Sequence, residues 1–302
     1  MQSSLVSFSN EVAKLVEEFQ PCVVAVHARG HYPSSGVVWR PGIIVTADHT
    51  IRREEDIQVT LPDGKRADAV LAGRDPGTDL AALKAEGLGS PAAQTGGGDA
   101  VKAGELALIL GRSPDSGPNA SLGVISAISG PWRTWRGGRL DNYIRLDATM
   151  FPNSSGAAVV DVRGRLLGIA TSALSRIAGL AIPATSVNRV LDVLVAKGHV
   201  PRGYLGIGAQ PVGIPDALRD SLSLTAKSGI MVVKVEAGGP ADKAGILLGD
   251  ILVSLGDAPL EEFEDLQSIS DSGIIGKQVQ ARVIRAGAIQ ELNITVGERP
   301  GK

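Results

Sequence analysis

One histidine, one aspartate and one serine lie beside three separate apolar stretches of the 302-residue chain. His49 comes directly after GIIVTAD, Asp79 lies in GRDPGTDLAALK, and Ser155 lies within DATMFPNSSGAAVVDVRGRLLGI. A serine hydroxyl becomes an effective nucleophile when a histidine takes its proton and a carboxylate holds that histidine in the right tautomer. The order His, Asp, Ser is one of several that such triads use. The spacing alone carries little weight, because most domains contain these residue types in this order.

Each of these residues also has an ordinary structural explanation. A single histidine at the end of a strand usually has no special role, and an aspartate beside a strand is more often a turn or cap residue. Asp75 lies close to Asp79 and competes for its role. Ser154 is adjacent to Ser155, and Ser-Ser-Gly is equally typical of a polar turn between two strands.

The segments around these residues predict a mainly β fold. Short apolar runs alternate with regular turns from Pro21 onward, including an Asp-Gly hairpin turn in LPDGKRA. Many short strands with few helices are typical of a barrel or sandwich. A helix is predicted at ATSVNRVLDVLVAKG, with Thr185 or Ser186 as its cap and Gly198 at its end.

HVPRGYLGIGAQPV indicates a domain boundary, and the order of elements changes after it. The remaining residues predict a small β-rich module with helical stretches at PADKAG and EEFEDLQSISDSG. The sequence therefore predicts an N-terminal segment over residues 1–20, a first domain over 21–198 and a second over 201–300.

The first residues predict an amphipathic helix, because apolar side chains from Leu5 to Phe19 recur at helical spacing. This helix either packs on its own domain or forms a subunit contact. It lacks the basic end and apolar core of a secretory signal, which predicts a cytoplasmic location for the chain as written.

Composition excludes several classes of protein. A net charge of −2 gives no indication of a nucleic-acid partner. Cys22 is the one cysteine and the four histidines are dispersed, so we expect neither a disulfide nor a metal site. No segment approaches the ~20 apolar residues that a membrane span needs.

The three stretches that carry His49, Asp79 and Ser155 resemble the active-site stretches of the HtrA/Deg serine proteases. The resemblance continues through SLGVISAIS and GLAIPATSV to RGYLGIGAQPV and GGPADKAGILLGDILVSLGDAPL, and it covers the chain from about residue 18 onward. It implies a chymotrypsin-like double β-barrel followed by a PDZ domain. It further implies His49 as general base, Asp79 as its orienting acid and Ser155 as nucleophile.

Counting along the family pattern from both flanks places Ser155 at the nucleophile and Ser154 at the preceding position. The resemblance implies that the backbone N–H groups of Asn153 and Ser155 form the oxyanion hole. Asn153 replaces the glycine of the family, and Ala157 and Ala158 replace a glycine and a proline. If the backbone at position 153 needs a positive φ, asparagine is among the better substitutes for glycine there.

The resemblance also implies two binding regions. Ile169, Ala170 and Thr171 are expected to line the primary specificity pocket, which predicts cleavage after small or medium aliphatic residues; the alternative is that they are barrel core. The amides of Leu205, Gly206 and Ile207, in GYLGI, are expected to bind a peptide carboxylate.

The predicted function is an ATP-independent serine endopeptidase that degrades unfolded or damaged proteins without a cofactor. The alternative is an inactive relative that binds peptides through its PDZ domain. The expected partners are unfolded polypeptides, protein C-termini or exposed apolar segments, and further copies of the chain in a homotrimer or higher oligomer. The N-terminal segment, with Phe8 and Phe19, is expected to hold that oligomer together. Family resemblance indicates the cell envelope if a targeting segment is missing from this sequence.

Overall fold

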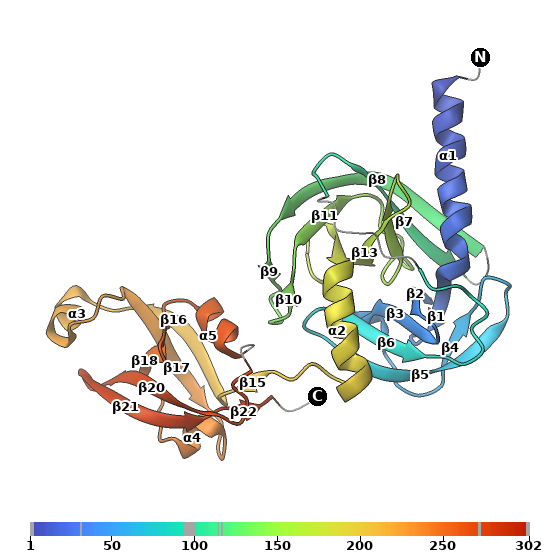
Figure 1. Ribbon diagram of the computed structural model, residues 1–302. Helices are drawn as coiled ribbons and strands as arrows, with labels where there is room; N and C mark the ends of the chain where they lie inside the picture. Colours follow the sequence, from blue (N-terminus) through green and yellow to red (C-terminus); the bar gives the residue numbers. More distant parts are fainter. Residues whose placement is uncertain are drawn as a thin grey trace. The chain divides into compact units, whose positions relative to one another are not determined.

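The computed structural model describes residues 3–30, 32–93, 101–113, 115, 117–270 and 273–299. The chain divides into two compact units, Met1–Val200 and Pro201–Lys302. Figure 1 shows helix α1 and two strand-rich lobes in the first unit, and a single twisted sheet with short helices in the second.

The first lobe is a closed antiparallel barrel with strand order β1-β2-β3-β6-β5-β4. Its interior is filled by aliphatic side chains, so the barrel is a solid core rather than a channel. The strands are β1 (Val23–His27), β2 (Ser34–Arg40), β3 (Ile43–Ala47), β4 (Ile57–Thr60), β5 (Arg66–Asp75) and β6 (Leu80–Lys84).

The second lobe is also a closed antiparallel barrel, with strand order β11-β14-β13-β12-β7-β8. A short hairpin of β9 (Trp132–Arg133) and β10 (Arg139–Leu140) extends from the connection between β8 and β11. The barrel strands are β7 (Leu106–Ser113), β8 (Gly117–Ser129), β11 (Tyr143–Asp147), β12 (Ala158–Asp161), β13 (Leu166–Thr171) and β14 (Gly179–Pro183).

Two helices pack on these barrels. Helix α2 (Ala184–Lys197) contacts β5, β6 and β13 and buries Val187, Val190 and Leu191. The predicted end of α2 at Gly198 agrees with the structure, where Gly198 adopts φ +78°. The predicted caps are wrong, because the helix begins at Ala184 with Pro183 before it, and the Ser186 hydroxyl instead accepts the Asp141 N–H.

Helix α1 (Ser4–Phe19) packs only its C-terminal half, and its N-terminal half projects from the barrels (Figure 1). A short 3-10 helix η1 (Gln20–Cys22) joins it to β1. Phe19 is buried in the core of its own chain. The prediction that Phe19 forms a subunit contact is therefore wrong. Phe8 is 41% exposed and stays available for such a contact.

The second unit is built on a sheet with order β16-β17-β18-β20-β21, and β19 pairs with β18. Strand β16 lies at the edge of this sheet, beside helix α5. Helix α3 was not anticipated from the sequence, and it covers a separate small apolar cluster with Ile214 and Val253. The elements are β15 (Gly203–Tyr204), β16 (Ile207–Gly213), α3 (Asp216–Leu222), β17 (Ser228–Val235), α4 (Pro240–Lys243), β18 (Ile251–Leu255), β19 (Ala258–Pro259), α5 (Phe263–Ser270), β20 (Gln278–Arg285), β21 (Ala288–Thr295) and β22 (Gly297–Glu298).

Candidate active site

His49 and Asp79 are brought together by the first barrel. His49 lies on the 3-10 helix η2 (Asp48–Thr50) directly after β3, and Asp79 directly precedes β6, the strand paired with β3. His49 Nδ1 lies 3.0 and 2.9 Å from the two Asp79 oxygens, and the His49 backbone N–H donates to Oδ1 at 2.9 Å. A carboxylate only accepts, so Nδ1 carries the proton and Nε2 is left free to act as a base.

Asp79 is fully buried and adopts φ +58°, a conformation that a non-glycine residue rarely takes. Its Oδ2 also accepts a short hydrogen bond from Thr171 on β13 of the second barrel. Three donors therefore hold this carboxylate in place. Asp75 has a different task, since its oxygens accept the Gly77 and Thr78 N–H groups and the Thr78 hydroxyl. Asp79, rather than Asp75, is the partner of His49.

Ser155 comes from the turn between β11 and β12 in the second barrel and is only 4% exposed as a residue. In the described part of the chain its Oγ has one hydrogen-bond partner, the hydroxyl of Ser172 at 3.1 Å, and no bond joins it to His49. Ser172 was not anticipated from the sequence. The Ser154 hydroxyl instead accepts the Phe151 N–H at 2.9 Å, so Ser154 closes its own turn.

Two successive turns shape the backbone around Ser155. In the first, the Ser154 N–H donates to the Phe151 carbonyl at 2.9 Å, and Asn153, the third residue, has a negative φ. This is not a type II turn, which would need a positive φ there. Asparagine therefore fits the backbone seen at this position without strain. The N–H groups of Asn153 and Ser155 donate to no acceptor among the described residues.

The first barrel anchors the nucleophile turn through Ser35 at the start of β2. The Ser35 N–H donates to the Ser155 carbonyl at 3.2 Å, and its hydroxyl donates to the Asn153 carbonyl at 2.7 Å. The same hydroxyl accepts the Arg112 N–H at 3.0 Å. Ser35 was not anticipated from the sequence, because its partners Asn153 and Ser155 lie far along the chain and such a serine has no motif of its own.

An ion pair between buried Asp48 and partly exposed Arg74 lies next to His49. Asp48 Oδ1 is 2.6 Å from Arg74 Nε, and Arg74 NH1 is 2.8 Å from Glu54. Burial raises the pKa of Asp48, although the hydrogen bond and charge of Arg74 oppose that shift. Arg74 also donates its backbone N–H to the Gly198 carbonyl at 2.9 Å, which joins this pair to the end of α2.

The three residues expected in the specificity pocket are all fully buried on β13. Ile169 belongs to the main core cluster, Ala170 packs in the core of the second barrel, and the Thr171 hydroxyl is committed to Asp79. Ser172, the next residue, is exposed and contacts the nucleophile.

The GYLGI loop of the second unit lies between β15 and the edge strand β16. The Leu205 and Gly206 carbonyls accept N–H groups of Ala241 and Glu236, both at 2.8 Å. The N–H groups of Leu205 and Gly206 donate to no described residue, and Gly206 adopts φ +74°. Ile207 begins β16 and pairs with Val235. A loop with free amides beside an open strand edge suits the carboxylate end of a peptide.

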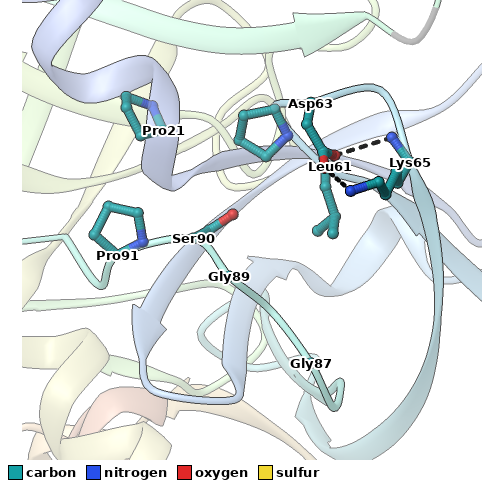
Figure 2. Close-up of a pocket in the computed structure, with 9 residues that line it drawn as sticks. Pro21, Leu61, Asp63, Lys65, Gly87, Gly89, Ser90 and Pro91 are labelled. Atoms are coloured by element: carbon teal, nitrogen blue, oxygen red, sulfur yellow. Dashed lines mark hydrogen bonds and ion pairs between the residues drawn. The ribbon is translucent and has the colours of Figure 1, made fainter.

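Other features of the described chain offer no alternative chemistry. A hollow of about 300 Å³ lies between Pro21, Leu61 and Pro91, and the Asp63–Lys65 ion pair at its rim is 2.9 Å long (Figure 2). It contains none of the residues predicted for catalysis. Within the described residues, His, Cys, Asp and Glu side chains form no group of three or more placed to hold a metal ion. Nor does that part of the chain contain a helix with the length and apolar character of a membrane span.

The comparisons with known proteins agree with this geometry. The Trypsin-like peptidase domain family matches residues 34–169, and the PDZ domain family matches residues 203–296. The chain is thus a trypsin-like peptidase domain followed by a PDZ domain, and the predicted double barrel with a C-terminal PDZ module is confirmed.

Proteins named probable periplasmic serine endoprotease DegP-like match most of the chain. The one from Ectopseudomonas mendocina is 30% identical over 272 residues, which are 88% of this chain and 56% of the relative. The one from Chlamydia trachomatis is 30% identical over 276 residues, which are 87% of this chain and 53% of the relative. The chain therefore spans about half the length of the curated relatives it matches.

Two solved structures match over nearly their full length. The serine endoprotease from Yersinia pestis is 29% identical with a TM-score of 0.77, and the match covers 95% of this chain and 98% of that one. The HtrA-type protease AlgW with a decapeptide is 28% identical with a TM-score of 0.77, over 96% and 99% of the two chains. The chain belongs to the HtrA/Deg family of serine proteases.

Proposed function

We propose that the chain is an ATP-independent serine endopeptidase that acts on unfolded or damaged proteins. The observation that carries this proposal is the paired His49 and fully buried Asp79, combined with Ser155 on the neighbouring barrel. The proposal assigns residues 1–20 to an N-terminal segment, 21–198 to the protease domain and 201–300 to the PDZ domain.

In the proposed reaction, Ser155 turns from Ser172 toward His49 and attacks the substrate carbonyl. His49 Nε2 takes the serine proton and passes it to the leaving amine, while Asp79 stabilises the charged imidazole. The free N–H groups of Asn153 and Ser155 bind the oxyanion. Water then attacks the acyl-enzyme with His49 again as base, which restores Ser155. The mechanism consumes no nucleotide and uses no metal.

Substrate choice is assigned to two regions. Strand β13 at Ile169, Ala170 and Thr171 is assigned to the residue before the scissile bond, although the three side chains are themselves packed in the core. Small or medium aliphatic side chains are expected there, because the stretch LLGIATSALSRIAGLAIP contains no acid to pair with Lys or Arg. The amides of Leu205, Gly206 and Ile207 bind the carboxylate of a protein C-terminus, whose chain adds to the open edge of β16.

We further propose a homotrimer or higher oligomer held by α1, with the exposed Phe8 at the contact. Relatives carry the word periplasmic in their names, which supports a location in the cell envelope. The second candidate function is a peptide-binding relative without turnover. The bond from Ser155 to Ser172 instead of His49 is the observation that favours it.

Labelling with a fluorophosphonate separates these functions, because the reagent reacts with an activated serine and needs no knowledge of the substrate. Wild type is expected to be labelled and to digest β-casein, and Ser155→Ala to do neither. Ser154→Ala is the matched control and should keep both properties. Absence of labelling in wild type with retained peptide binding would establish the second function. Loss of labelling in Ser154→Ala alone would move the nucleophile to Ser154.

A further inference from the structure

A second hollow of about 450 Å³ lies beside the nucleophile turn, within the ~300–1,000 Å³ range of small-ligand sites. Four ring side chains line it, two from each of two chain segments that we call its walls: Tyr32 and Pro33 before β2, and Phe151 and Pro152 in the nucleophile turn. Tyr32 is 73% and Phe151 46% exposed, although aromatic side chains are usually covered in a protein without a partner.

Arg29 fixes the two walls relative to each other. Its guanidinium donates to the Tyr32 carbonyl at 2.8 Å and to the Pro33 carbonyl at 3.4 Å on the first wall. On the second wall it donates to the Pro152 carbonyl in a short hydrogen bond. One cation therefore links the backbones of the two walls, whereas the Tyr32 and Phe151 side chains that line the hollow stay largely exposed.

The position of Asn153 indicates which part of the substrate, before or after the scissile bond, lies nearer to the hollow. It lines the hollow and also supplies one of the two amides assigned to the oxyanion. No residue of β13, the strand assigned to the acyl side of the substrate, lines the hollow. A polypeptide that crosses Ser155 from β13 therefore reaches the hollow with the residues that follow its scissile bond.

We propose that this hollow binds an aromatic or large apolar side chain of the substrate segment C-terminal to the scissile bond. The inference rests on the proposed function and adds a specificity determinant to it. Aromatic rings are the preferred occupants, because the four ring side chains offer flat apolar faces. Asp115 is the charged residue among the described lining residues, so an acidic side chain in the same place is disfavoured.

The direct test is binding to the full chain with Ser155→Ala. The probes are fluorescent peptides that carry only the leaving-side residues, and their C-termini are amidated so that a carboxylate site cannot capture them. A peptide with Phe is expected to bind about tenfold tighter than the same peptide with Ala, from burial of the ring. Adding Tyr32→Ala should remove most of this difference, and Tyr32→Phe should keep it. Val70→Ala, at a 69% exposed residue elsewhere, is the matched control.

Turnover gives a second readout. Tyr32→Ala should lower kcat/KM for internally quenched peptides with Phe after the scissile bond, and leave hydrolysis of p-nitroanilides, which lack those residues, unchanged. Asp115→Asn should relax the discrimination against acidic peptides. Equal binding of the Phe and Ala peptides to Ser155→Ala would overturn the inference, whether or not the wild type cleaves. Loss of fluorophosphonate labelling in wild type would reject the proposed function instead.

Discussion

At the scale of single residues, the site depends on polar side chains that are held by specific hydrogen bonds and ion pairs. Asp79 has three donors, Ser35 ties the nucleophile turn to the first barrel, and Arg74 neutralises Asp48 beside His49. Burying a charge without a partner is costly, so each of these carboxylates depends on its donors. The Asp48–Arg74 pair allows this dependence to be measured without touching the residues assigned to catalysis.

Arg74→Met is expected to destabilise the fold by about 3–5 kcal/mol, because it leaves Asp48 buried without a cation. Burial raises the pKa of Asp48 in the folded chain above its unfolded value. Ionised Asp48 therefore costs folding free energy as the pH rises through that pKa, and the loss in the variant should be larger near pH ~8 than near pH ~5. Urea unfolding at both pH values measures it.

Two variants serve as controls for this prediction. Asp48→Asn added to Arg74→Met should recover part of the stability at the higher pH, since the buried charge is gone. Arg40→Met breaks an exposed pair with Asp192, whose contribution is about 0–1 kcal/mol. An equal loss for Arg74→Met at both pH values would show that Arg74 stabilises the fold by packing and not through its charge.

At the scale of elements, the turn that carries Ser155 is defined by its glycine. Gly156 adopts φ +86° as the third residue of a turn closed by the Ala157 N–H and the Ser154 carbonyl at 3.1 Å. A Cβ at Gly156 would lie 2.0 Å from the Ser35 carbonyl oxygen and 2.4 Å from the Thr46 hydroxyl. Neither neighbour can withdraw cheaply, because both belong to the paired strands β2 and β3.

Gly156→Ala is therefore expected to lower the free energy of unfolding by about 1–3 kcal/mol. It should also reduce the fluorophosphonate labelling of Ser155. Thermal unfolding and the labelling rate measure the two effects. Gly130→Ala is the matched control, since a Cβ there meets nothing within 4 Å and φ is not positive. If both alanine variants unfold at the same temperature, the turn tolerates a second conformation and the glycine is not required.

The sequence predicted the elements better than it predicted their contacts. Apolar periodicity and turn residues predicted a barrel or sandwich, the family resemblance added that there are two barrels, and Gly198 ended α2 as expected. Ser186 did not cap that helix, because a hydroxyl binds whichever backbone group the tertiary fold brings nearest, here Asp141. The roles of Arg29 and Ser172 arise in the same way, from contacts between segments more than a dozen residues apart. No local pattern encodes such contacts.

At the scale of the whole molecule, the chain is two units with separate hydrophobic cores. The residues assigned to catalysis all lie in Met1–Val200, and the loop assigned to carboxylate binding lies in Pro201–Lys302. Because each unit buries its own core, chemistry and peptide recognition are expected to be separable by truncation. A chain ending at Val200 should keep the labelling of Ser155 and lose the binding of C-terminal peptides.

The peptide carboxylate is the group on which recognition by the second unit is expected to depend. A fluorescent apolar peptide with a free C-terminus should bind the full chain roughly 10- to 100-fold tighter than the same peptide with an amidated end, since hydrogen bonds to a charged group contribute about 1.5–3 kcal/mol. Gly206→Val should weaken the free peptide to the level of the amidated one, because φ +74° is strained for a β-branched residue. Val233→Ala, at a 44% exposed valine, is the control. Equal affinity of the two peptides, measured by fluorescence anisotropy, would mean that the free amides of Leu205 and Gly206 serve another ligand.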